Sequence, residues 1–207
     1  MALTKVIGNG LGTLGDGTAN DTKIVFDGNA QDYHIGLDDS ADTLVIGKGS
    51  ALGTTTSMSF DANGIITKPL QPAFNVTMSS NSAQFGSGAF QPTLDTEIFD
   101  QNADFASNTF TAPVTGRYFL SWMVYAANLD TSASYYYNLI STSNRNYYKY
   151  LFTAAFASDM AYYGWSVTAL ADMDANDTAS FYLGQNNGHS TSQIYAADTR
   201  AMGFLVC

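Results

Sequence analysis

The most informative hydrophobic pattern lies within Phe110–Trp122, which reads FTAPVTGRYFLSW. Pro113 fixes its own φ and biases Ala112 toward extended geometry, while Gly116 permits a turn conformation that a residue with a Cβ resists. From Arg117 onward, aromatic and β-branched residues follow one another without the alternation of a strand that has one solvated face. The pattern predicts a pivot at 114–116, followed by a central strand that is buried on both faces.

The first 70 residues show a different pattern, in which short apolar pieces alternate with turn residues rich in Gly, Asp and Asn. This spacing predicts five short strands. They are 23–26, 33–36, 44–47, 58–60 and 65–67. The same 70 residues hold 11 of the 18 glycines but only three of the 28 aromatic residues, so a boundary is predicted between Lys68 and Pro72.

A single copy of this N-terminal region has too few apolar side chains to enclose a core. Three copies around a common axis would bury those side chains against their symmetry mates. We expect this of Ile24, Phe26, Ile35, Leu44, Ile46, Phe60 and Ile65. The predicted organisation is a flexible docking root at 1–18, a β-rich trimeric shaft at 19–70, and a head domain at 71–207.

The motif in Phe110–Trp122 resembles the hallmark F-T-x-P-x-x-G-x-Y-x-F of the globular head of complement component 1q, a tumour-necrosis-factor-like jelly roll. Further segments resemble that family's first, late and closing strands. They are Pro72–Val76, Ser166–Leu183 and Met202–Val206. The resemblance implies an all-β jelly-roll head and a homotrimer. It does not extend to 128–159, so no binding residue of the family is carried over there.

The shaft, with phrases such as DYHIGLDDSADTLVIGKGS ahead of a globular head, resembles bacteriophage tail-fibre and head-fibre proteins. That resemblance implies a viral structural protein on the virion surface, whose root docks on other virion proteins and whose head contacts the host cell. A capsid decoration protein that clamps shell subunits and recognises no host remains the alternative.

The composition of the chain limits the classes of molecule that we expect it to bind. Eighteen acidic against eight basic residues give a formal charge of −10, which repels nucleic acid and anionic bilayers. No apolar segment reaches the length of a membrane span or of a signal-peptide core. Cys207 is the only cysteine, so no intrachain disulfide is expected.

Candidate chemistry is sparse. The two histidines, His34 and His189, lack the spacing of metal ligands, and no nucleophile elbow is present. Asp172, Asp174 and Asn176 copy the start of a calcium loop, but the required Gly and Glu are replaced by Asp177 and Leu183. We therefore expect no enzyme, no cofactor and no bound metal, and interpret 174–177 as a turn that its own Asp and Asn side chains cap. Calcium held by Asp172, Asp174 and Asn176 in another geometry, as the resemblance to the complement 1q head allows, stays the alternative.

Tyrosine supplies the remaining candidate site, since 12 of the 13 copies lie between Tyr118 and Tyr195. Such clusters place side chains on both faces of a strand, so some fill the core while others face outward. Outward tyrosines give flat, amphipathic contact area that suits a cell-surface glycan or protein. The predicted receptor-binding residues are Tyr135, Tyr137, Asn144, Arg145, Asn146, Tyr147 and Tyr148.

Overall fold

The computed structural model describes residues 14–207, which form strands and two short 3₁₀ helices. The chain divides into two compact units, Met1–Leu70 and Gln71–Cys207, and each is described by itself. Most of the predicted docking root, residues 1–13, lies outside the described residues.

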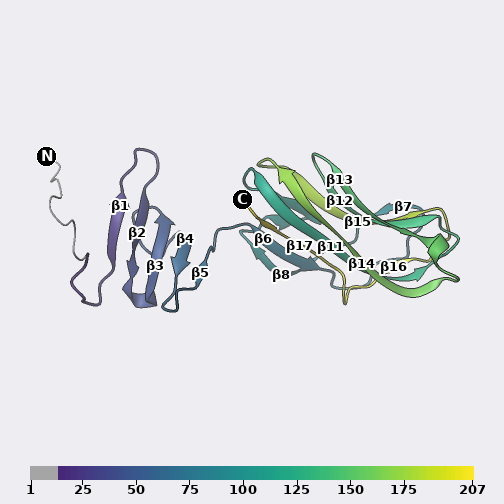
Figure 1. Cartoon of the computed structure of the whole chain (residues 1–207), viewed down its shortest axis with the longest axis horizontal. Helices are drawn as coiled ribbons and strands as arrows, with labels where there is room; N and C mark the ends of the chain where they lie inside the picture. Colours follow the sequence, from purple (N-terminus) through teal and green to yellow (C-terminus); the bar gives the residue numbers. More distant parts are fainter. Residues whose placement is uncertain (1–13) are drawn as a thin grey trace. The chain divides into compact units, whose positions relative to one another are not determined.

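The first unit is one antiparallel sheet, the N-terminal sheet, in which five strands follow each other in chain order (Figure 1). Its elements are β1 (Thr22–Phe26), β2 (Tyr33–Asp38), η1 (Asp39–Ala41), β3 (Thr43–Lys48), β4 (Thr56–Phe60) and β5 (Ile66–Thr67). The strands lie where the alternation of apolar pieces and turn residues predicts them. Asp38 caps η1 through a hydrogen bond from the Ala41 amide (3.2 Å), which shows how Asp-rich turns separate the strands.

One face of the N-terminal sheet is almost entirely apolar. The pairing places Ile24 opposite Ile35, which pairs in turn with Ile46, and side chains two residues apart share a face. The apolar face comprises Ile24, Phe26, Tyr33, Ile35, Leu37, Leu44, Ile46, Met58, Phe60 and Ile66. Every residue predicted to meet symmetry mates is among them except Ile65, which lies just before β5.

The middle of the opposite face of the N-terminal sheet is buried by the chain itself, although Lys23 and Val25 of β1 are exposed. His34 is buried there, with Nδ1 2.8 Å from the carbonyl oxygen of Gly49. A Cβ added at Gly47 would lie 2.6 Å from the His34 ring, so the imidazole packs directly on the glycine backbone and leaves no room for a side chain there. His34 is therefore a packed structural residue, whereas nothing within residues 14–70 covers the apolar face.

The head consists of two antiparallel sheets that face each other (Figure 1). The first has the order β14-β11-β17-β6-β8, with β16 also paired to β11, and the second has the order β13-β12-β15-β10-β9, with β7 also paired to β15. Apart from the β9–β10 and β12–β13 hairpins and the step from β16 to β17, successive strands cross from one sheet to the other, which is the jelly-roll arrangement. The prediction of an all-β, jelly-roll head is confirmed.

The head's elements run from β6 to β17. They are β6 (Ala73–Thr77), β7 (Gly88–Phe90), β8 (Thr96–Gln101), β9 (Phe105–Ala106), β10 (Thr109–Thr111), β11 (Gly116–Leu129), β12 (Tyr135–Thr142), β13 (Asn146–Phe152), η2 (Thr153–Ala155), β14 (Met160–Met173), β15 (Thr178–Asn186), β16 (Gln193–Ile194) and β17 (Arg200–Leu205). The family-like segments occupy β6, β14, β15 and β17.

The core lies between the two sheets and is strongly aromatic. Phe74 of β6 stacks on Phe110 of β10, with ring centroids 4.7 Å apart. Trp122 of β11 is fully buried and donates a hydrogen bond from Nε1 to the carbonyl oxygen of Tyr182 in β15 (2.9 Å). This bond ties one sheet to the other through the centre of the head.

Strand β11 is central, since it pairs with β14 on one side and β17 on the other. Its burial nevertheless alternates: Tyr118, Leu120 and Trp122 are buried, whereas Arg117 and Met123 are exposed. The expectation that both faces are buried is wrong for a single chain. The outward side chains of Phe119 and Met123 are apolar all the same, so the sequence pattern indicates a cover that one chain does not provide.

Gly116 corrects a second expectation. Its φ is not among the positive values, so the turn does not require a left-handed conformation at this position. A Cβ on Gly116 would instead lie 2.6 Å from both the Cys207 carbonyl oxygen and Leu205 Cδ1. The glycine is needed because the C-terminal segment crosses directly over it.

The substitution Gly116→Ala is expected to lower the free energy of unfolding by about 1–3 kcal/mol, because the C-terminal backbone must move to admit a methyl group. Gly164→Ala is the matched control, since a Cβ there would lie 3.6 Å from its nearest neighbours. Chemical denaturation of both variants checks this. Equal stabilities for the two would contradict the steric account.

Candidate binding surface

Strands β12 and β13 form a hairpin whose pairing brings aromatic residues together. Tyr135 pairs with Phe152, Tyr137 with Tyr150, and Leu139 with Tyr148. Because side chains alternate between faces, these residues share the outer face of the second sheet. We call Tyr135, Tyr137, Tyr148, Tyr150 and Phe152 the tyrosine face.

The rings of the tyrosine face contact one another across and along the strands. Tyr148 and Tyr150 are nearly parallel, with centroids 5.5 Å apart, and Tyr150 and Phe152 follow at 6.1 Å. Tyr135 and Tyr137 of β12 meet this row edge-on, at 5.4 Å from Tyr150 and 5.5 Å from Tyr148. The rings hold each other in place, so the surface is preorganised.

Strand β15 pairs with β12 and extends this surface, and its residue Gly184 makes room for the Tyr137 ring. It pairs with Tyr137, and a Cβ added to it would lie 1.9 Å from the Tyr137 ring. The phenol ring therefore lies down over the bare backbone of the neighbouring strand. Burial of this kind raises the pKa of the Tyr137 hydroxyl, with further contributions from the neighbouring tyrosines.

The outer edge of the tyrosine face is polar and neutral. Ser141 Oγ donates to Asn146 Oδ1 (2.8 Å), and Asn146 Nδ2 donates to the Tyr148 hydroxyl (3.3 Å). The outward positions of β12, β13 and β15 carry no Asp, Glu, Lys or Arg side chain. The surface thus combines aromatic rings with hydroxyl and amide groups and bears no formal charge.

The structure unites only part of the predicted site. Tyr135, Tyr137, Tyr148 and Asn146 lie together on the outer face. Tyr147 instead packs against the core, because it pairs with the inward residue Ile140. Placing it in the outward cluster is wrong.

Asn144 and Arg145 lie in the turn between β12 and β13. Asn144 Nδ2 donates to Asp177 Oδ2 (2.7 Å), which ties that turn to the next one. The backbone of Arg145 closes the hairpin, since its carbonyl oxygen accepts from the Thr142 amide (3.0 Å) and its side chain is exposed. Both residues flank the tyrosine face, and their role in binding stays a prediction.

The prediction missed Tyr150 and Phe152, which are 45% and 61% exposed. Both follow Tyr148 at intervals of two residues, so strand periodicity was the signal that could have identified them. The even-numbered residues of β13 face outward and the odd-numbered ones face the core side. The aromatic face is therefore larger than the predicted cluster.

A second group, at one end of the head, contains Asp130, Ser132 and His189. Asp130 is buried and accepts from the Ser132 amide (2.8 Å), the Ser132 hydroxyl (2.6 Å) and His189 Nδ1 (2.8 Å). Ser132 Oγ lies 3.3 Å from the same Nδ1. A catalytic triad needs Ser and Asp on opposite ring nitrogens, so this geometry is that of a loop clamp.

The clamp makes an acid-sensitivity prediction. The His189 backbone N–H, followed by the Ser132 hydroxyl, holds the pKa of Asp130 well below its ordinary value of 3.8. A carboxyl whose pKa is lower in the folded state stabilises the fold above pH about 4, and this stabilisation is lost as the pH falls below that value.

Asp130→Asn should lower the free energy of unfolding at pH 7 by about 1–3 kcal/mol and flatten its decline between about pH 4 and pH 2. Denaturation across that pH range checks both effects. The matched control is Asp198→Asn, an exposed carboxyl whose replacement should leave the curve unchanged. An unchanged acid slope in Asp130→Asn would contradict the assignment.

The acidic turn at 174–177 confirms the interpretation as a self-capped turn. Asp177 Oδ2 accepts from the Asp174 amide (2.8 Å), and Asn176 has a φ of +74°, a conformation that asparagine tolerates. Asp172 pairs with Arg117 on the neighbouring strand. Within residues 14–207, no group of three or more His, Cys, Asp or Glu side chains could hold a metal ion.

The outer face of the first sheet forms another apolar surface. Phe119 pairs with Phe204 on one side and Leu170 on the other, and the two phenylalanine rings lie 5.4 Å apart. We call Phe119, Met123, Leu170, Met202 and Phe204 the β11 face. Leu170 and Phe204 are 61% and 47% exposed. The exposed apolar side chains of the β11 face are neighbours on paired strands, so they form one continuous surface.

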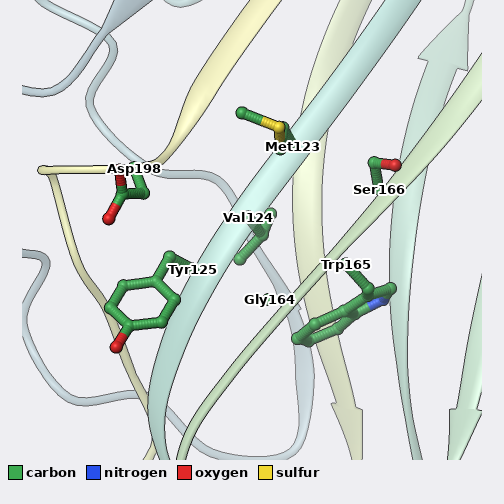
Figure 2. Close-up of a pocket in the computed structure, with 7 residues that line it drawn as sticks. All are labelled: Met123, Val124, Tyr125, Gly164, Trp165, Ser166 and Asp198. Carbon is green, nitrogen blue, oxygen red and sulfur yellow. The ribbon is translucent and has the colours of Figure 1, made fainter.

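A pocket of about 300 Å³ lies at the Met123 end of the β11 face. Figure 2 shows Tyr125 and Asp198 on one side of Val124, with Trp165 and Ser166 on the other. Gly164, opposite Tyr125 on β14, leaves the space open.

In the described residues, no helix is long and apolar enough to cross a membrane.

No family model matches the chain, and no curated protein matches it. It is similar to solved structures of the globular domain of zebrafish complement 1qA protein (17% identity, 66% of this chain and 98% of that chain, TM-score 0.46). It is also similar to murine APRIL at pH 8.0 (10% identity, 66% of this chain and 99% of that chain, TM-score 0.47). The zebrafish domain comes from the family that the FTAPVTGRYFLSW motif resembles.

Proposed function

We propose that this protein is a homotrimeric structural protein of a bacteriophage particle, displayed on the virion surface. In this proposal it forms a short fibre whose N-terminal segment docks on other virion proteins and whose head contacts the host cell without enzymatic action. The observation that supports assembly is the pair of apolar sheet faces that one chain leaves uncovered, one in each unit, and the placement on a virion rests on the sequence resemblance of the shaft to bacteriophage fibres.

The apolar face of the N-terminal sheet supports self-assembly. Phe26 is 60% exposed and Leu37 47%, although burying such a side chain stabilises by about 1.5–3 kcal/mol. Stable monomers rarely expose contiguous apolar faces of this kind. Further copies of the same sheet would cover it with matching side chains.

The β11 face supports the same conclusion for the head. Its central rows consist of aromatic, Leu and Met side chains, and the Ser121 and Thr168 hydroxyls provide few polar groups between them. Three copies around a closed axis give every chain the same covered face, which leaves no open end. The number three rests on the sequence resemblance to the complement 1q head.

The tyrosine face favours host contact over a purely capsid-clamping role. It lies on the second sheet, whereas the β11 face lies on the first, so assembly through the β11 face leaves the tyrosine face open. Three such faces at fixed spacing would bind a repetitive cell surface with an avidity that exceeds single-site affinity by about 10² to 10⁴. Decoration of a capsid does not need that surface.

A competition assay tests the proposal. Purified full-length protein is expected to reduce adsorption of particles to their host cells, and a labelled antibody should place the protein on intact particles. A protein that binds empty shells but leaves adsorption unchanged would favour the decoration alternative. Absence from particles would overturn the viral proposal altogether.

A further inference from the structure

We infer that the tyrosine face binds a neutral polysaccharide, with sugar rings laid across Tyr148, Tyr150 and Phe152 and their hydroxyl groups bonded to the polar edge. This inference rests on the proposed contact with a cell surface, and it names the chemical class recognised there.

Three aromatic side chains of β13 are exposed to solvent. Tyr148, Tyr150 and Phe152 are 43%, 45% and 61% exposed, whereas the core side of the same strand packs Tyr147 and Leu151 against the core. A strand needs only one apolar face to pack on the core, so three outward aromatics in succession are not explained by folding. They are explained by a ligand that contacts the outward face.

The ring geometry suits a chain of sugar rings. Successive centroids along β13 are 5.5 and 6.1 Å apart, close to the length of one pyranose ring in an extended polysaccharide. The ring planes are inclined by only 14° and 24°, so the three rings stack on one another, and sugar rings would contact their exposed edges and the Tyr148 and Tyr150 hydroxyl groups. Because the rings are held by Tyr135 and Tyr137, little side-chain entropy is lost on binding.

The absence of formal charge selects the type of sugar. The outward positions of β12, β13 and β15 carry no ionisable Asp, Glu, Lys or Arg, and the chain as a whole has a formal charge of −10. An anionic polysaccharide would meet repulsion without a basic partner on this face. A neutral hydroxyl-rich ligand instead finds the Ser141, Asn146 and Tyr148 groups at the edge.

The probe is an array of immobilised oligosaccharides of glucose, galactose, mannose, rhamnose and N-acetylglucosamine, alongside sulfated and sialylated oligosaccharides. Labelled full-length protein is expected to bind neutral members and not the anionic ones. Tyr148→Ala with Tyr150→Ala should weaken that binding by about tenfold or more. Lys149→Ala is the matched control, because Lys149 lies between these tyrosines and belongs to the opposite set of side chains.

Three outcomes would overturn the inference: binding to anionic oligosaccharides alone, no binding to any neutral oligosaccharide, or equal loss in Lys149→Ala. A change in the mass of the assembled protein in the tyrosine variant would also overturn it, since the face would then join copies of this chain. The competition assay separates the two proposals. Protein that still blocks adsorption but binds no neutral sugar refutes the glycan and leaves the proposed function standing.

Discussion

Replacing Phe119 and Phe204 together by aspartate is expected to weaken the assembly, so that the protein dissociates to a species of lower mass at a higher protein concentration than the unmodified protein does, with a folded head. The two rings meet at 5.4 Å in the middle of the β11 face, and both point away from the chain's own core. Each new carboxylate would have to lose its hydration to enter an interface between copies, which costs several kcal/mol per ion. The three copies would bring six such charges together.

The measurement is light scattering coupled to size-exclusion chromatography, with circular dichroism to confirm that the head remains folded. Val114→Asp is the matched control, because Val114 is 46% exposed and lies in the turn before β11 rather than on the β11 face. Its mass should equal that of the unmodified protein. The mass is followed over a dilution series, because the apolar face of the N-terminal sheet is unaltered in this variant. Dissociation at the same concentration as the unmodified protein would exclude the β11 face as an assembly surface.

Replacing Trp122 by alanine should have the largest effect on the stability of the head. Trp122 is fully buried, its indole Nε1 bonds to Tyr182 of the opposite sheet (2.9 Å), and its ring lies 5.9 Å from that of Phe181. Removing the ring leaves a cavity and orphans the Tyr182 carbonyl group. The expected loss is about 3–5 kcal/mol of unfolding free energy.

Denaturant unfolding at one fixed protein concentration measures this loss, because the stability of an oligomer depends on concentration. Trp165→Ala is the comparison, since Trp165 is only partly buried and borders the open pocket on the β11 face. It should cost clearly less. Equal losses for the two tryptophans would contradict the view that Trp122 is the centre of the core.

Strand positions were predictable because they depend on local signals. Asp, Asn and Gly between short apolar pieces predict the turns of the N-terminal sheet, and the family-like motif predicts the order of the head strands. The continuous apolar run of β11 also carried information about assembly. A single chain covers only the Trp122 side, so the apolar Phe119 side indicates a surface that other copies cover.

The details that sequence could not supply depend on contacts between distant residues. Gly116 is required by the Cys207 backbone, which approaches it from the far end of the chain. The pairing of β13 with β12 decides which residues of β13 face outward. The charged residue Lys149 does not reveal this from sequence, because on an edge strand it is exposed although it belongs to the core-facing set. Tyr147 was for that reason placed outward, and Tyr150 and Phe152 were missed.

Three groups of aromatic side chains in the head therefore differ in their partner. One group fills the space between the sheets, a second lies on the β11 face, and the third forms the tyrosine face. The first group is defined by burial within the chain, and the second by the cover that we assign to further copies. Only the third is left for a partner of different chemistry.

The assembly state is the most direct test of this account. Sedimentation equilibrium of the purified full-length protein at several concentrations should give the mass of three chains, because both apolar faces require identical partners and the resemblance to the complement 1q head implies three of them. The same mass should persist on dilution, as expected when two units of each chain contribute to the interface. A mass of one chain at every concentration would contradict the account.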